Sequence, residues 1–289
     1  MISKKEKKME TFFKENKRVV VAFSGGADSS LLAAIAFDKL GSDAIAVTIQ
    51  TELTAEAEIK NAKKTAKEIG IKHIILEKKI LEIPEIRMNQ KNRCYACKKE
   101  IIAALLKYAD ENGFETVVEG TNDSDRLLSE SDEIPRPGFL FIAEQKRKQE
   151  KEKAGAKVKT PLADLKIKKE EVRKMAKKRK LSVADKPSMS CLATRFSYDT
   201  PLSPSLLKGI ADAEKIPARI GAKQIRIRCH ADGAGRKIAR IEVDKKEMKL
   251  FLKKKNQMCL DELIDFLKRN GFSYVTLDLE GFKSGSMDI

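Results

Sequence analysis

Histidine residues and long apolar runs are scarce in this chain. Its 289 residues include only two histidines, His73 and His230, which leaves little room for a catalytic apparatus built on histidine. Long apolar runs are also missing: no window approaches the roughly 18 consecutive apolar residues that a membrane span needs. The lysine-rich start, Met1 to Lys8, is not followed by the apolar segment of a signal peptide. We therefore expect a cytoplasmic protein that does not enter a membrane.

The composition is that of a globular protein with a basic surface. Apolar residues make up 42% of the chain and charged residues 35%. At this length we expect two domains, residues 1–200 and residues 201–289, with Pro201 and Pro204 at the boundary. The net charge of +16 is consistent with RNA, with polyanionic small molecules such as ATP, or with a lysine-rich surface. Most lysines are interleaved with glutamates, as in 144–153, so we do not expect nucleic acid to be the partner.

A glycine-rich turn between two apolar runs is the most informative stretch. Val19–Ala22 is typical of a buried strand and Leu31–Ala36 of a buried helix, and Ser24-Gly25-Gly26-Ala27-Asp28-Ser29-Ser30 lies between them. The two glycines allow a tight turn and bring backbone N–H groups close to a ligand. Together with the serine hydroxyls and the helix N-terminus, these donors favour an anion. The loop of kinases and GTPases is excluded, because its lysine is missing and the glycines are adjacent.

Strands and helices alternate along the first 200 residues, which predicts an α/β fold with a doubly wound parallel sheet of the Rossmann-like kind. Strands are expected at 18–23, 44–49, 73–76 and 116–119. Helices are expected at 6–15, from the loop to Gly41, from a Thr54 cap to Gly70, at 94–112 and at 170–180, with a further charged helix at 139–153 inside a flap.

Ligands of such a sheet lie at the carboxyl ends of its strands. The predicted nucleotide-binding residues are therefore Ser24, Gly25, Gly26, Asp28, Ser29, Ser30, Thr48, Gly120 and Thr121. Beyond residue 201 the pattern predicts a small α+β domain that binds substrate or joins subunits. It has a helix at 205–214, strands at 224–228, 237–243 and 274–277, and helices near Lys245 and Leu260.

Cysteines supply the second chemical signal. Cys94 and Cys97 open a predicted helix, so both sulfurs lie on one face near its positive end, which favours thiolates. Cys191 follows the last helix of the first domain and can reach the same strand ends. Three thiolates suit a [4Fe–4S] cluster with one open iron; four, with Cys229, would suit a structural zinc; free thiols are the third interpretation. Cys229 and Cys259 are more simply packing residues.

The loop resembles the S-G-G-x-D-S pyrophosphate loop of the PP-loop ATP pyrophosphatases, which cleave ATP between its α- and β-phosphates. The chain as a whole resembles the LarE family, the ATP-dependent sulfur transferases that make the pyridinium bisthiocarboxylate mononucleotide of the nickel-pincer cofactor. The stretch 124–135 departs from that family by being longer and more acidic. The matching segments are residues 24–29, 92–98, 119–122, 136–138, 187–195, 226–228, 239–242 and 281–286.

The resemblance implies a reaction in two halves. ATP with Mg²⁺ activates a substrate carboxylate as an acyl-adenylate and releases pyrophosphate, and sulfide then displaces AMP. It implies catalytic roles for Asp28, Arg195 and Cys191. Arg226 and Arg228 alternate on one strand face, so both can meet one phosphate, and with Arg195 they are expected to hold the substrate's phosphate.

The source of sulfur divides the family into two kinds. Some members have a single cysteine, in the position of Cys191, that gives up its own sulfur. Others have three cysteines that hold a [4Fe–4S] cluster, whose open iron is thought to carry an extra sulfide. Cys94, Cys97 and Cys191 are all present, so this chain is expected to be of the cluster kind. We expect sulfide or a sulfur donor protein as a partner, and a homo-oligomer.

Two other functions fit parts of the same sequence. One is a cluster-dependent PP-loop tRNA thiolase, which would explain the positive charge but lacks a recognisable RNA-binding module. The other is a zinc-stabilised nucleotide-binding protein without catalysis, which would contain zinc and no iron and would not turn over ATP.

Overall fold

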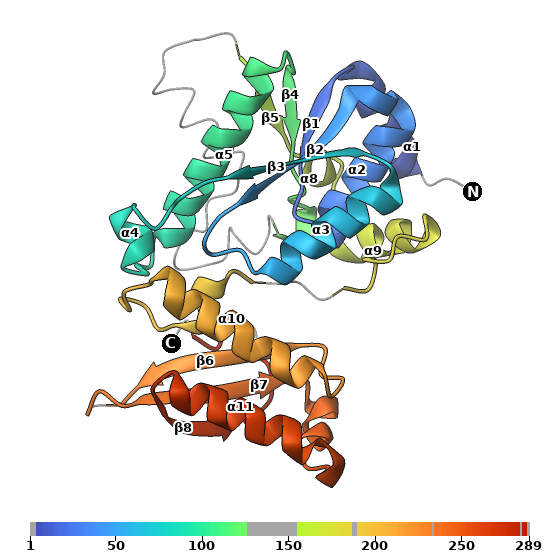
Figure 1. Ribbon diagram of the computed structural model, residues 1–289. Helices are drawn as coiled ribbons and strands as arrows, with labels where there is room; N and C mark the ends of the chain where they lie inside the picture. The colour runs from blue at the N-terminus through green and yellow to red at the C-terminus, as the bar shows by residue number, and fades with distance from the viewer. Residues whose placement is uncertain (1–3, 126–154, 187–189, 233, 284, 288–289) are drawn as a thin grey trace. The chain divides into compact units, whose positions relative to one another are not determined.

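The computed structural model of the protein describes residues 4–125, 155–186, 190–232, 234–283 and 285–287 (Figure 1). The helix predicted at 139–153 lies outside these residues. The chain divides into unit 1, Met1–Ile80 with Cys94–Met189, and unit 2, Leu81–Arg93 with Ser190–Ile289. This division differs from the boundary expected after residue 200. The side-chain amide of Asn89 donates hydrogen bonds to the carbonyl oxygens of Phe196 and Ser197, at 3.2 and 2.8 Å, and so joins the early segment to unit 2.

Unit 1 is built on a five-stranded sheet in which all neighbouring strands are parallel. The strand order is β3-β2-β1-β4-β5. Strands β2 and β3 are therefore added on one side of β1, and β4 and β5 on the other side. The point of reversal lies between β1 and β4, where doubly wound sheets bind ligands. The predicted fold class is therefore confirmed. The strands are β1 Val19–Ala22, β2 Ala44–Gln50, β3 Lys72–Glu77, β4 Thr116–Val118 and β5 Lys157–Lys159.

Helices cover both faces of this sheet (Figure 1). Val19 and Val21 of β1 belong to one core and Val20 to the other, as the alternation of a strand requires. The first core is closed by α1 Lys4–Glu15, α2 Ala27–Leu40, α3 Glu56–Ile69, α8 Pro161–Asp164 and α9 Lys169–Lys178. The second core is closed by α5 Arg93–Glu111.

The ends of the helices follow local chemistry in most places. Gly41 and Gly70 end α2 and α3 with positive φ angles of 56° and 86°, as predicted. The predicted Thr54 cap is wrong: α3 begins at Glu56 after Ala55, and the Thr54 hydroxyl instead accepts a hydrogen bond from the N–H of Thr51 at 3.2 Å. The short strand β5 was not predicted.

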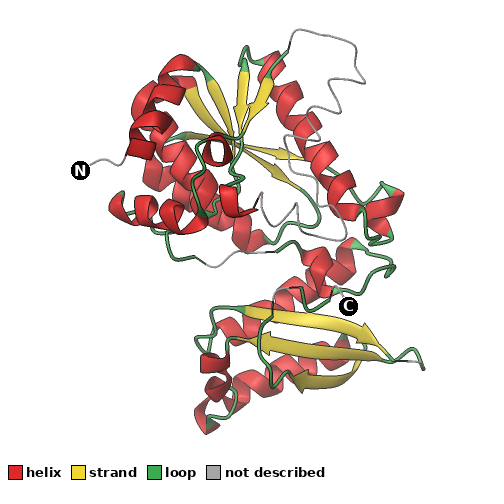
Figure 2. Cartoon of the chain, turned by 180° about the vertical axis from the view of Figure 1, so that it is seen from behind, coloured by secondary structure: helices red, strands yellow, loops and turns green. Residues whose placement is uncertain are grey.

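Unit 2 confirms the predicted α+β composition. Its sheet has the order β6-β7-β8, with β6 and β7 antiparallel and β7 and β8 parallel. Two helices, α10 and α11, lie on one face of this sheet, and Figure 2 shows the other face. Near Lys245 the chain forms a 3₁₀-helix, where a helix was expected, and α10 continues beyond Glu214 to Ala218. The elements are α4 Pro84–Arg87, η2 Leu192–Arg195, α10 Pro204–Ala218, β6 Ile225–Ala231, β7 Lys237–Val243, η3 Lys245–Leu250, η4 Lys254–Asn256, α11 Gln257–Arg269 and β8 Phe272–Leu277.

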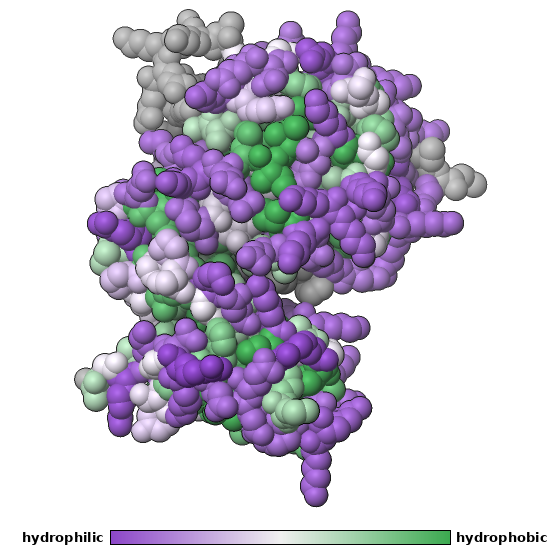
Figure 3. All heavy atoms as spheres, in the orientation of Figure 1, coloured by the Kyte–Doolittle hydropathy of each residue, from purple (hydrophilic) through white to green (hydrophobic). Residues whose placement is uncertain are grey.

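The surface is mostly hydrophilic on the face drawn in Figure 3. Within the described residues, no helix combines the length and the apolar character that crossing a bilayer requires. The most exposed large hydrophobic side chains among the described residues are Leu252, Met258 and Leu279 of unit 2.

Candidate functional site

The glycine-rich loop after β1 packs closely against α3. Gly25 has a φ of +68°, and a Cβ at this position would lie 2.7 Å from the Cα of Ala62. Both the backbone angle and the close approach require glycine. Gly26 differs: its φ is −85°, and a Cβ there would meet only the hydroxyl of Ser24, at 3.4 Å. The loop is thus held against α3 at Gly25 and leads through Gly26 into the N-terminus of α2.

Serine hydroxyls shape the loop from inside. The hydroxyl oxygens of Ser24 and Ser29 lie 3.1 Å apart, and the N–H of Gly26 donates to Ser24 Oγ at 3.3 Å. The N–H of Ser24 donates to Ser29 Oγ at 3.2 Å. Ser30 Oγ is buried and has no hydrogen-bond partner among the described residues. Preformed N–H and hydroxyl donors at the positive end of α2 fit a bound phosphate.

Asp28, in the first turn of α2, is the centre of a polar network. The side-chain amide of Asn122 donates to Asp28 Oδ1 at 3.1 Å and to Asp125 Oδ2 at 2.5 Å. Lys169, the first residue of α9, forms an ion pair with Asp28. Burial, and then the charge of Asp28, raise the pKa of Asp125. Carboxylate oxygens are ligands that Mg²⁺ prefers, so Asp28 in this setting fits the metal that accompanies ATP.

The turn after β4 packs against the same first turn of α2. A Cβ on Gly120 would lie 3.1 Å from the Cβ of Asp28 and 3.2 Å from the backbone nitrogen of Ser29. The structure therefore brings the predicted residue Gly120 to the loop. Thr121 follows, and its N–H donates to Glu119 Oε2 at 3.1 Å.

Glu119 is a site residue that the sequence analysis did not single out. It is buried at the carboxyl end of β4, and its Oε1 has no hydrogen-bond partner in the described part of the chain. Burial is the main cause that raises the pKa of Glu119 to about 7. A carboxyl group that is half protonated near neutrality thus braces the Gly120–Thr121 turn.

Thr48, predicted to bind the nucleotide, has a structural contact in this protein. Its hydroxyl donates to the carbonyl oxygen of Phe23 at 2.5 Å and lies 2.8 Å from His73 Nε2. The rings of Phe23 and His73 meet edge to face at 5.3 Å. Burial, followed by the charge of Lys63, lowers the pKa of His73. Thr48 therefore ties the end of β1 to β2 and β3, directly before the loop.

The three predicted cluster ligands belong to different units. Cys94 and Cys97 lie one turn apart in α5 of unit 1, and Cys191 precedes η2 in unit 2. All three are part-exposed, and thiolate sulfur is the ligand that iron–sulfur clusters use, so the donor set fits such a cluster. No group of three or more Cys, His, Asp or Glu residues among those described is arranged to hold a metal ion. The three-cysteine site stays a prediction.

The arginines predicted to hold a phosphate are buried in unit 2. Arg226 and Arg228 alternate with the buried Ile225 and Ile227 along β6, so the arginines share one face of the sheet. Arg228 donates to Glu242 Oε2 through Nε and Nη2, at 3.0 and 2.9 Å, and to the carbonyl oxygen of Thr194 at 2.7 Å. The guanidinium of Arg226 lies over the ring of Phe282, 5.5 Å from its centroid.

Arg195 has an equally complete set of contacts. Its Nε and Nη2 donate to the two carboxylate oxygens of Glu214, at 2.9 and 3.0 Å. Its Nη1 donates to the carbonyl oxygens of Ser190 and Cys191, at 2.9 and 3.2 Å. Arg195 thus fixes the backbone on which Cys191 lies. A carboxylate partner for each of Arg195 and Arg228 is a feature that the sequence did not reveal.

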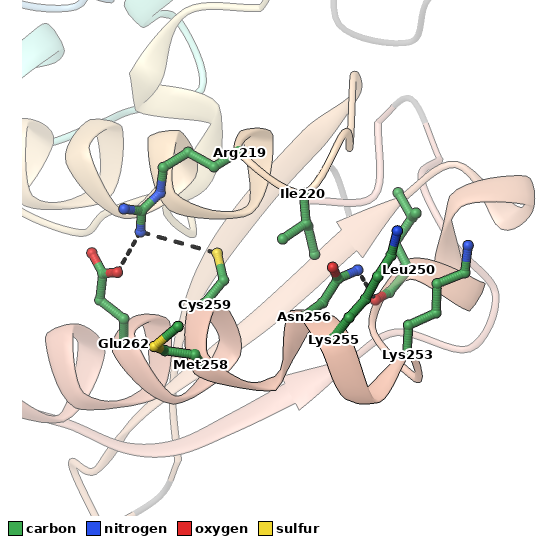
Figure 4. A pocket seen from close by; sticks show the side chains of 9 residues that line it. All are labelled: Arg219, Ile220, Leu250, Lys253, Lys255, Asn256, Met258, Cys259 and Glu262. Carbon is green, nitrogen blue, oxygen red and sulfur yellow. Dashed lines mark hydrogen bonds and ion pairs between the residues drawn. The ribbon is translucent and has the colours of Figure 1, made fainter.

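A shallow pocket of unit 2 is separate from the predicted site residues. It lies between the end of α10 and the start of α11 (Figure 4). Arg219 is paired there with Glu262, and the thiol of Cys259 donates to the carbonyl oxygen of Ile216 at 3.3 Å. Cys259 therefore connects α11 to the end of α10.

Known proteins resemble this chain along nearly its whole length. The family "Queuosine biosynthesis protein QueC" matches residues 18–199. An uncharacterized protein of Synechocystis sp. is 34% identical over 288 residues, 100% of this chain and 98% of its own. The pyridinium-3,5-bisthiocarboxylic acid mononucleotide synthase of Lactiplantibacillus plantarum is 32% identical over 276 residues, 95% of this chain and 90% of its own. An uncharacterized protein of Methanocaldococcus jannaschii is 30% identical over 270 residues, 93% of this chain and 92% of its own.

Proposed function

Since the chain belongs to the PP-loop family that the QueC description represents, and to the same family as the L. plantarum synthase, we propose that it is an ATP-dependent sulfur transferase. Its substrate would be a pyridinium biscarboxylate mononucleotide, and its products the thiocarboxylates, AMP and pyrophosphate. The observation that supports this most directly is the loop: Gly25 is pressed against Ala62, and Asp28 stands at the N-terminus of α2.

Carboxylates are poor electrophiles, which is why ATP is needed before sulfur can enter. In the proposed reaction a substrate carboxylate oxygen attacks the α-phosphorus of ATP, and the bond to pyrophosphate breaks. The hydroxyls of Ser24 and Ser29 and the N–H groups that begin α2 would receive the departing phosphates. Asp28 would hold the Mg²⁺ that offsets their charge. Gly120 and Thr121 would complete the nucleotide site, and Thr48 would support it from behind by holding the end of β1 through Phe23.

Sulfur transfer is assigned to Cys94, Cys97 and Cys191. We propose that these three side chains hold a [4Fe–4S] cluster, which when bound would supply the sulfide that is transferred. Arg195 would position Cys191, because it donates to the carbonyl oxygen of that residue at 3.2 Å. A cysteine pair one turn apart in α5 supports this proposal, since a mechanism that consumes Cys191 alone does not need it.

The mononucleotide's phosphate is assigned to Arg226 and Arg228, with Arg195 beside them. Arg228 and Arg195 already hold Glu242 and Glu214, so a phosphate would share their guanidinium groups with these carboxylates. Replacing Arg226 by Ala should therefore raise the KM of the substrate much more than that of ATP. Equal effects on both would reject this assignment.

The experiment uses protein reconstituted with iron and sulfide without oxygen, then given ATP, Mg²⁺ and the biscarboxylate mononucleotide. We expect AMP, pyrophosphate and thiocarboxylate in repeated turnovers, with the protein's intact mass unchanged. Asp28→Asn or Ser24→Ala should suppress pyrophosphate release about 100-fold while the fold is retained. Cys94→Ser with Cys97→Ser should abolish turnover, and Cys259→Ser, a thiol outside the proposed site, should not.

Several outcomes would contradict the proposal. ADP and phosphate as products would exclude the pyrophosphatase reaction. A dehydroalanine in place of Cys191, or activity that survives loss of both Cys94 and Cys97, would exclude the cluster. Thiolation of tRNA in place of the mononucleotide would favour a tRNA thiolase, and bound zinc without ATP turnover would favour a non-catalytic nucleotide-binding protein.

A further inference from the structure

Residues 87–93 and 196–202, both in unit 2, are joined by a set of contacts that we call the clamp. Its centre is Asn89, which is completely buried. The side-chain amide of Asn89 donates to the carbonyl oxygens of Phe196 and Ser197, at 3.2 and 2.8 Å. Hydrogen bonds that are shielded from water are stronger than exposed ones. Asn89 therefore fixes the backbone that follows η2.

Further contacts extend the clamp on both sides of Asn89. On one side, the N–H of Leu202 donates to the carbonyl oxygen of Arg87 at 2.7 Å. On the other side, the guanidinium group of Arg93 lies over the ring of Tyr198, 4.5 Å from its centroid. The two segments are thus held together along their length, and Arg93 is the last residue of the earlier one.

The clamp lies between the predicted cluster ligands along the chain. Arg93 is followed directly by Cys94, and consecutive Cα atoms are only about 3.8 Å apart. On the other segment, Arg195 holds the carbonyl oxygen of Cys191, and Asn89 holds that of the residue after Arg195. The clamp therefore limits how far the start of α5 can move from the loop that carries Cys191.

Two properties of Asn89 do not favour stability. Its φ of +52° lies in the left-handed region, which glycine adopts with less strain. Its Oδ1 is buried without a hydrogen-bond partner among the described residues, and an unpartnered buried acceptor lowers the stability of a fold. Glycine would adopt the same angle without the unpaired oxygen. The side chain is therefore explained by the backbone groups to which its amide donates.

We propose that Asn89 is a positioning residue for sulfur transfer. Its amide holds the loop of Cys191 at the start of α5, so that the thiols of Cys94, Cys97 and Cys191 lie within reach of one another before iron binds. This inference rests on the proposed function, because it presupposes that these three cysteines act together.

Thiol crosslinking of the full chain without iron tests this without catalysis. Dibromobimane, a short reagent that joins two nearby thiols, would be added to chelator-treated protein, and the joined peptides would be identified by mass spectrometry. In wild type we expect Cys191 to be joined to Cys94 or Cys97. Asn89→Gly keeps the backbone angle and removes the amide, so it should form this crosslink about 10-fold more slowly.

Asn256→Gly is the matched control. Asn256 is also buried, and its amide donates to the carbonyl oxygen of Leu250 at 2.8 Å, outside the clamp. This variant should form the crosslink at the wild-type rate, and urea unfolding would show how much stability each glycine variant loses. Arg93→Met is a second test of the clamp: it removes the contact with Tyr198 and should slow the crosslink about 3-fold.

Reconstitution with iron and sulfide without oxygen gives a second readout. Wild type should take up about four iron atoms per chain. Asn89→Gly should take up less than about half of this in the same time, because its thiols are no longer held together. Both proteins should bind ATP with the same Kd, since the glycine-rich loop belongs to unit 1 and the clamp to unit 2.

The two levels of inference fail in different ways. Wild type in which Cys191 is joined to neither Cys94 nor Cys97 would overturn the three-cysteine site together with the role of Asn89. Wild type that forms the crosslink, with Asn89→Gly equal to the control in crosslinking and iron uptake, would overturn the role of Asn89 alone. Where Asn89→Gly does not fold, Arg93→Met decides, and a wild-type rate in that variant would overturn the role of the clamp.

Discussion

The ion pairs at the predicted sites of the two units differ in exposure. Unit 1 keeps Asp28 and Lys169 part-exposed beside an anion-binding loop, at 17% and 30% exposure. Unit 2 buries its pair: Arg228 is 4% exposed and Glu242 is 0% exposed. A part-exposed pair adds little stability and can exchange partners with a ligand. Removing one member of a buried pair leaves an uncompensated charge, so such a pair holds the fold.

The largest effect is expected from Arg228→Met, which removes the guanidinium that makes two hydrogen bonds to the buried Glu242; the contacts of Glu242 with Arg240 and Ser286 stay. We expect a loss of about 3 to 5 kcal/mol in the free energy of unfolding, measured by urea denaturation. The control is Arg236→Met, because Arg236 is 56% exposed and the loss of its exposed pair with Asp232 should leave the denaturation midpoint almost unchanged. Equal denaturation midpoints for the two variants would contradict the conclusion that the buried pair stabilises the fold more than the exposed pair.

The next effect concerns Glu119, the buried carboxyl group of unit 1. Burial is the main cause that raises its pKa from the usual 4.5 to about 7; hydrogen bonds with Thr121 and then the charge of Lys98 oppose the rise, and the charge of Asp125 adds to it. The native state therefore holds this proton more tightly than the unfolded chain. Its contribution to stability is complete below pH 4.5 and is lost as the pH rises to about 7.

Glu119→Gln removes this dependence, because glutamine cannot ionise. Urea unfolding at pH 5 should show similar stability for wild type and variant. At pH 8 the variant should be more stable than wild type by up to about 3 kcal/mol. The difference between the two proteins cancels the titration of all other groups. A difference that does not change between pH 5 and pH 8 would show that Glu119 is ionised throughout.

The smallest effect compares two neighbouring glycines of the loop. Gly25→Ala would place a side chain at a φ of +68° and 2.7 Å from the Cα of Ala62, so we expect a loss of about 1 to 3 kcal/mol and a displaced loop. Gly26→Ala, at an ordinary φ of −85°, should leave stability within about 1 kcal/mol. Thermal unfolding would measure both. Similar losses for the two would mean that the contact with α3 does not constrain the loop.

Local sequence was sufficient to predict the glycine-rich loop and most of the helices and strands of unit 1. Val19–Ala22, the adjacent glycines and the apolar run after Asp28 predict a strand, a tight turn and a buried helix, and all three are observed. Anion binding by this turn stays a prediction. The parallel sheet could be predicted because strands and helices alternate along the chain, and parallel strands need crossover connections, usually helices. The strand β5 could not be predicted, because a segment of three residues is too short to show the alternation of apolar and polar side chains that is typical of a strand.

The sequence by itself determined which chemistry the chain can offer: donors for phosphate after β1, thiols at Cys94, Cys97 and Cys191, and arginines at alternating positions of a strand. Tertiary structure alone decided which charges meet. Lys169 reaches Asp28 across 141 residues, and Arg195 and Arg228 find Glu214 and Glu242. Burial is the main cause that raises the pKa of Glu119 to about 7. The physical reason is that electrostatic interactions depend on distance and on exclusion of water, and neither is encoded in the spacing of residues along the chain.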